Sequence, residues 1–173
     1  MNPQIEAASH DFKAHPRDRV GAAKKILGEI GPGRTAPDVE SLLGPPTVRI
    51  WDYALFYSST LTVSFDPAMR VTKIESDIAD ESDGSGDDKE LPAIKLAVAQ
   101  FKSQPYVRQD AARKLIPFLK IGMPAQEVDA LLGRPNRTIW EYSLVGHSEQ
   151  VLIVNFDEND RVKDTTLMSA PNE

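Results

Sequence analysis

The feature that most constrains this sequence is one pattern that occurs twice. Residues Gly33–Tyr53 read GRTAPDVESLLGPPTVRIWDY, and residues Gly122–Tyr142 read GMPAQEVDALLGRPNRTIWEY. The offset is 122 − 33 = 89, and about 21 of the 53 positions in Pro3–Leu55 are identical to their counterparts 89 residues later. After Leu144 the second copy is two residues longer than the first, since Phe65 corresponds to Phe156 (156 − 65 = 91). The sequence therefore predicts a tandem duplication in which the two copies function together.

The repeat sets the expected domain organisation. Residues 1–79 form the first repeat and residues 91–173 the second. A repeat of roughly 80 residues is near the size at which a lone hydrophobic core is marginal, so we expect the two to pack together. Residues 80–90 are acidic and rich in glycine and serine, which is typical of a flexible linker.

Two or three helices are expected at the start of each repeat. Apolar residues at helical spacing predict the first helix over Pro3–Lys13 and Pro92–Lys102. In each repeat a proline then marks the start of a second helix. The third helix carries the V-x-x-L-L-G-x-P pattern. Thr35 is a good N-cap residue, and Gly44 and Gly133 supply the left-handed residue that ends such a helix.

Alternating apolar and polar residues predict three strands after the helices of each repeat. The expected ranges are Arg49–Tyr57, Thr60–Phe65 and Arg70–Ile78, then Thr138–Val145, Val151–Phe156 and Arg161–Met168. The fold class is therefore α+β, with two tandem helix–helix–antiparallel meander repeats and the helices on one face of the sheet. The residues expected in the core are Leu42, Leu43, Val63, Phe65, Leu131, Leu132, Val154 and Phe156.

Composition narrows the possible partners. The net charge of −6 argues against a nucleic-acid partner and favours a basic protein. The chain has no cysteine, no apolar run as long as a membrane span and no recognisable signal peptide, so we expect a cytoplasmic protein that binds no membrane. A leader removed from the sequence would give the same pattern.

Catalytic chemistry is sparse in the sequence. His10, His15 and His147 are isolated and are expected to be solvated, and no phosphate-binding loop or nucleophile elbow occurs. The acidic run Asp157–Asp160 lacks the glycine and distal glutamate of an EF-hand and is expected to be a turn. We therefore expect no enzyme activity, no catalytic residues, no metal and no cofactor.

The candidate binding site is the sheet face that the helices do not use. We expect partner contacts from Asp52, Thr60, Thr62, Glu141, Ser143, His147, Val151, Ile153 and Asn155. Val151 and Ile153 side by side resemble the apolar centre of an interface with a polar rim. Their strand propensity alone would also explain them, and Asp52 and Glu141 could simply face solvent. The second repeat, with the loop Gly146–Gln150, is expected to make the main contact.

The pattern G-x-x-x-x-[DE]-V-x-x-L-L-G-x-P, followed by W-x-Y and L-x-V-x-F-D-x-x-x-R-V, resembles the outer-membrane-assembly lipoprotein domain of the SmpA/OmlA type. A tandem pair of such units resembles the beta-lactamase-inhibitor-protein fold, which implies two sheets joined into one concave, protein-binding surface. The chain departs from these families in having neither a lipobox cysteine nor disulfides.

The resemblance implies a non-enzymatic protein-binding module, and our leading hypothesis is an inhibitor or immunity-type protein that neutralises an enzyme or toxin. A structural or assembly subunit related to envelope lipoproteins is the alternative, and an enzyme is the least favoured hypothesis.

Overall fold

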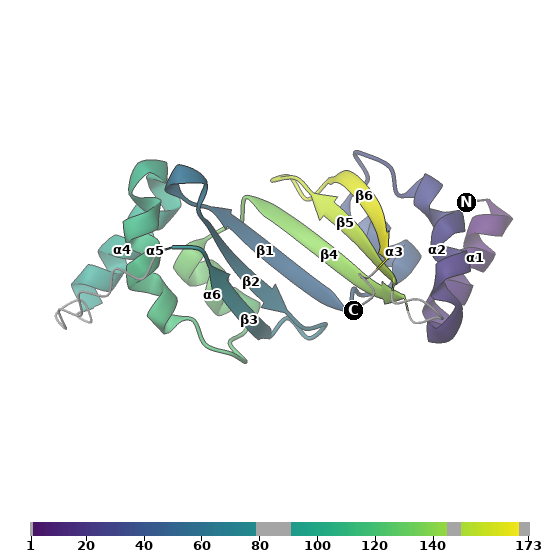
Figure 1. The fold of residues 1–173 in the computed structure, drawn as a ribbon, viewed down its shortest axis with the longest axis horizontal. Coiled ribbons are helices and arrows are strands. Elements are labelled where there is room, and N and C mark those ends of the chain that lie inside the picture. The colour runs from purple at the N-terminus through teal and green to yellow at the C-terminus, as the bar shows by residue number, and fades with distance from the viewer. Residues whose placement is uncertain (1, 79–90, 145–149, 170–173) are drawn as a thin grey trace. The chain divides into compact units, whose positions relative to one another are not determined.

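The computed structural model describes residues 2–78, 91–144 and 150–169. Within these residues the protein is α+β, with six α-helices and six strands (Figure 1). The helices are α1 (Pro3–Ala14), α2 (Arg19–Ile26), α3 (Ala36–Leu43), α4 (Leu91–Ser103), α5 (Arg108–Leu115) and α6 (Ala125–Leu132). The strands are β1 (Val48–Ala54), β2 (Thr60–Phe65), β3 (Val71–Ser76), β4 (Arg137–Leu144), β5 (Gln150–Phe156) and β6 (Val162–Ser169).

The third helix of each half begins and ends as its sequence predicts. In α3 the Thr35 hydroxyl accepts from the Asp38 amide, and the Asp38 carboxylate accepts from the Thr35 amide, which completes a capping box. The Thr35 hydroxyl also donates to the Asp38 carboxylate at 2.7 Å, and this hydrogen bond, together with the one from the Thr35 amide, lowers the pKa of Asp38. Gly44 (φ 75°) and Gly133 (φ 72°) end α3 and α6 in the left-handed region.

The first strand is shorter than predicted. It ends at Ala54 instead of Tyr57, because Tyr57 and Ser58 have positive φ angles of 56° and 65° and turn the chain back towards β2. The Leu55 amide donates to the Ser59 carbonyl across this turn. Residues 55–59 contain no Asn-Gly or Asp-Gly pair, which is the usual mark of a turn with two left-handed residues.

The chain forms two compact units, and their boundaries do not coincide with those of the predicted repeats. One unit comprises Met1–Arg49 with Arg137–Glu173, and the other comprises Ile50–Asn136. The first unit therefore combines α1–α3 with β4–β6, and the second combines α4–α6 with β2, β3 and most of β1. In each unit, helices from one half of the sequence pack on strands from the other half.

The core residues show the same exchange. In the first unit Phe12, Ile26 and Leu43 of the helices join a buried cluster with Val154 and Phe156 of β5. In the second unit the helices contribute Phe101, Leu115 and Leu132, and the strands contribute residues that include Val63 and Phe65. Seven of the eight residues expected in the core are buried, and Leu131 is only half-buried, at the margin of its cluster.

The strand order is β4-β5-β6 in the first unit and β3-β2-β1 in the second. β5 pairs antiparallel with both β4 and β6, and β2 pairs antiparallel with β3. The proposed linker, residues 80–90, lies outside the described residues. The duplication, and the joining of the sheets into one concave surface, stay predictions.

One buried contact occurs in both units and joins the two halves of the sequence. The Tyr142 hydroxyl of β4 donates to the Gly44 carbonyl at 3.1 Å, and the Tyr53 hydroxyl of β1 donates to the Gly133 carbonyl at 3.0 Å. Each glycine follows the helix that ends at the L-L-G pattern. Burial raises the pKa of both tyrosines, so both phenols stay protonated and act as donors.

An aromatic and an arginine side chain complete each contact. The Phe12 ring lies edge-on to Tyr142 at 5.8 Å, and the Phe101 ring lies in the same way against Tyr53 at 5.7 Å. Arg19 stacks on Phe12, and its Nε donates to the Phe12 carbonyl at 2.9 Å. Arg108 repeats both interactions with Phe101. The tyrosine is thus held from several sides.

We expect Tyr142→Phe to lower the free energy of unfolding by about 0.5–1.5 kcal/mol, because the Gly44 carbonyl loses its donor in a buried setting. Tyr53→Phe should have a similar effect in the other unit. Urea denaturation followed by circular dichroism measures both. Tyr106→Phe, at a residue that is 79% exposed, is the control and should leave stability unchanged. Equal stability of all three variants would contradict a stabilising role for the two hydrogen bonds.

We also expect the fragments 1–79 and 91–173 to be unable to fold separately as monomers. The apolar face of α1–α3 is covered by strands that belong to the other fragment, and the same holds for α4–α6. Mixed in equal amounts, the fragments should regain the circular dichroism spectrum and the cooperative melting of the intact chain. A monomeric 1–79 fragment that unfolds cooperatively would show that the exchange is not needed.

Candidate protein-binding surface

The face of β4–β6 opposite the core carries most of the predicted contact residues. Strand alternation buries Tyr142, Leu152 and Val154 and turns their neighbours to the opposite side. On that side Glu141 lies opposite Ile153, and Ser143 lies opposite Val151. We define the outer face of the first unit by the residues on this side: Ile139, Glu141, Ser143, Val151, Ile153, Asn155, Asp164, Thr166 and Met168.

The middle of this face is apolar. Ile139, Val151 and Ile153 are half-buried, and Met168, which lies opposite Val151 on β6, is 50% exposed. None of these four side chains belongs to the buried cluster beneath the sheet. In Figure 1 helix α3 lies on the far side of β4 and β5, so it covers the other face.

Polar groups border the apolar residues. The Asn155 amide nitrogen donates to Asp164 at 2.5 Å, and both lie opposite each other on β5 and β6. The Ser143 amide donates to the Thr47 hydroxyl at 3.0 Å, and the Thr47 amide donates to the Glu141 carbonyl at 2.8 Å. An apolar centre with a polar border is the arrangement of a small protein-binding patch.

The corresponding face of the second unit is polar. The Thr62 hydroxyl donates to the Asp52 carboxylate at 2.9 Å, and Thr62 lies opposite Glu75 on β3. Thr60 is exposed, whereas Ser64, opposite Lys73, is buried although its strand position predicts an outward side chain. At the offset of 91, Thr62 stands where the first unit has Ile153.

The predicted contact residues therefore fall into two groups. Glu141, Ser143, Val151, Ile153 and Asn155 share the outer face of the first unit, and Asp52, Thr60 and Thr62 lie on the sheet of the second. His147, with most of the loop Gly146–Gln150, lies outside the described residues. The alternation of β6 could have added Met168 to the prediction.

An exposed aromatic group was missed by the sequence analysis. Phe56 contacts Tyr57 with ring centroids 4.0 Å apart, and Tyr106 lies 5.9 Å from Phe56. Tyr57 and Tyr106 are 84% and 79% exposed. Tyrosine is enriched at protein interfaces, so this group is a secondary candidate for contact. The prediction of β1 running to Tyr57 concealed the turn that exposes it.

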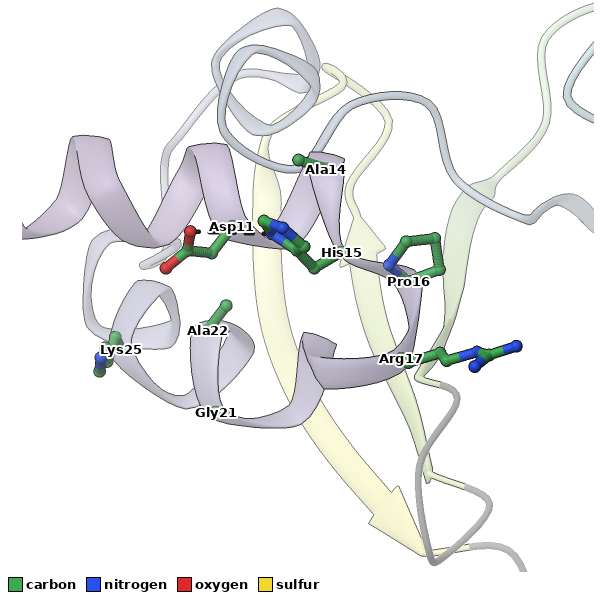
Figure 2. A pocket seen from close by; sticks show the side chains of 8 residues that line it. All are labelled: Asp11, Ala14, His15, Pro16, Arg17, Gly21, Ala22 and Lys25. Carbon is green, nitrogen blue, oxygen red and sulfur yellow. Dashed lines mark ion pairs between the residues drawn. The ribbon is translucent and has the colours of Figure 1, made fainter.

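A hollow of about 660 Å³ lies where α1 turns into α2 (Figure 2). Asp11 and His15 face one another there, with 3.9 Å between the carboxylate oxygen and Nδ1, and both are exposed. An exposed pair at this distance is a weak ion pair even when the histidine is protonated. At the offset of 89, Asp110 and Tyr106 replace Gly21 and Arg17 of the lining.

In the described part of the chain, no group of histidine, aspartate or glutamate side chains could hold a metal ion. No helix in the same ranges is long and apolar enough to cross a membrane. Burial lowers the pKa of Arg108.

Comparison with known protein families, with curated protein sequences and with solved structures yields no match for this chain.

Proposed function

We propose that this chain is a non-enzymatic protein-binding module whose principal contact surface is the outer face of the first unit. The observation that carries the proposal is the apolar centre at Ile139, Val151, Ile153 and Met168, together with its polar border. A β-branched residue singly exposed on a strand reflects strand propensity. Four apolar neighbours on one uncovered face gain more from a partner that removes them from water.

The proposed role is that of an inhibitor or immunity-type protein that neutralises an enzyme or toxin. The net charge of −6 suits association with a basic partner, because complementary charge raises the association rate. The resemblance to tandem inhibitor folds supports the same class. Its motif residues end helices and pack the core, so they support a fold more strongly than a partner.

The alternative is a structural subunit of an envelope assembly, which the resemblance to the lipoprotein domain favours. The two roles differ in what happens to the partner. An inhibitor abolishes the activity of an enzyme or toxin when it binds, whereas an assembly subunit leaves that activity intact.

We expect Ile153→Asp to weaken binding to the native partner at least about tenfold, because it places a charge at the centre of the apolar patch. Glu141→Lys should weaken binding to a basic partner through charge repulsion. The partner is first captured on the wild-type chain and purified, and the affinity of each variant is then measured by calorimetry.

Ala54→Asp is the control, since Ala54 is exposed on the sheet of the other unit and the substitution introduces the same charge as Ile153→Asp. It should bind the partner as the wild type does. Circular dichroism establishes that each variant is folded. Unchanged affinity in both Ile153→Asp and Glu141→Lys would eliminate this surface and direct attention to the aromatic group at Tyr57.

A further inference from the structure

Strand β3 presents an open edge. It pairs with β2 on one side, and within the described residues no strand pairs with its other side. The start of that edge is covered, because the Val71 amide donates to the Met123 carbonyl at 2.9 Å and the Val71 carbonyl accepts from Gly122 at 2.7 Å. The described structure therefore leaves the edge open from Thr72 to Ser76.

The backbone groups of this segment are directed outward at alternate residues. The Asp77 amide donates to the Thr60 carbonyl, one position beyond the Leu61–Ser76 pair. Since hydrogen-bonding groups alternate in direction along a strand, Lys73 and Glu75 also direct theirs towards β2. The amides and carbonyls of Ile74 and Ser76 then point away from β2, where another strand can bind them. The register shift between Ser64 and Phe65 interrupts this alternation at Thr72.

The side chains of the edge are self-complementary in one register. We propose that β3 pairs antiparallel with β3 of a second copy of this chain, about a two-fold axis at Ile74. In this register Lys73 of each copy lies opposite Glu75 of the other, and Thr72 lies opposite Ser76. The interface is isologous, as is usual for two-fold dimers.

The electrostatic geometry favours this register over its neighbours. Lys73 Nζ and Glu75 Oε1 are 2.7 Å apart on the same face of β3, and both side chains are mostly exposed. Pairing about Ile74 forms a ring of four alternating charges. When the two-fold axis is perpendicular to the sheet, two residues that face each other must have their side chains on the same side of the sheet. The axis must therefore pass through a residue, and the nearest other registers have it at Lys73 or at Glu75. Those registers place lysine against lysine or glutamate against glutamate, which is unfavourable.

Ile74 supplies an apolar contact on the opposite side. It lies opposite Val63 of β2, and it packs half-buried against the core of the second unit. Pairing about Ile74 brings the two isoleucines together and extends each core across the new strand pair. Opposite-charge and β-branched cross-strand pairs both stabilise antiparallel strands.

The edge strand of the first unit lacks these properties. At the offset of 91, Asp164 and Thr166 of β6 occupy the positions of Lys73 and Glu75, and Asp164 is hydrogen-bonded to Asn155. Charges on an edge strand usually serve to prevent pairing. In β3 their alternation instead selects one partner, a second copy.

Sedimentation velocity of the full chain at low ionic strength over a range of concentrations tests the proposal. The wild type should form a concentration-dependent dimer. Lys73→Glu and Glu75→Lys should each raise the dissociation constant at least about tenfold, because each places like charges opposite one another across the axis. An equimolar mixture of the two variants should dimerise again, since every facing pair in the mixed dimer is then oppositely charged.

Two further variants separate this effect from general charge and from misfolding. Lys163→Glu changes the net charge as Lys73→Glu does but lies on β6, and it should dimerise as the wild type does. The exchange Lys73→Glu with Glu75→Lys should restore the homodimer. A wild type that stays monomeric would overturn the proposal. So would a dimer that the single charge reversals leave unchanged, or a mixture that does not associate.

Discussion

The hydrogen bond from a buried tyrosine to the glycine that ends a helix is the contact on which this structure most depends. A helix leaves its last carbonyl groups without partners, and a buried phenol needs an acceptor. Tyr142 with Gly44, and Tyr53 with Gly133, meet both needs at once. Each pair joins opposite halves of the sequence, as do the helices and strands that build each of the two cores.

The exchange makes the motif residues structural in both units. A lysine from α1 or α4 reinforces the same corner, since Lys13 donates to the Ser41 carbonyl and Lys102 donates to the Ala130 carbonyl. Within the first unit Arg49 stacks on Trp140 of β4 and also pairs with Glu40 of α3, so it joins these two elements. These contacts show that the pattern repeated in the two halves serves to build the fold. Differences in function must therefore arise from the residues in which the halves differ.

Those differences are concentrated on the outer faces and edges of the strands. Ile153 and Thr62 occupy equivalent positions, yet one contributes to an apolar patch and the other to a hydrogen bond with Asp52. The edges differ in the same way, because Lys73 and Glu75 have no charged equivalents that alternate in sign on β6. We propose that the patch binds a different protein and that the edge binds a second copy.

The sequence alone determined the local structure. The capping residues Thr35 and Asp38, the helix-ending glycines and the strand alternation each depend on neighbours a few residues away, so helix ends and inward faces could be predicted. The outer-face position of Ile153 followed from the same alternation. Tertiary structure decided what local rules do not encode. Two similar sets of helices and strands can pair within a half or between halves, and the local pattern is the same in both cases. The structure shows the exchange, in which Tyr142 binds Gly44 of the other half. The left-handed turn at Tyr57 could not be predicted from the sequence either, because the turn contains no glycine or asparagine, the residues typical of that conformation.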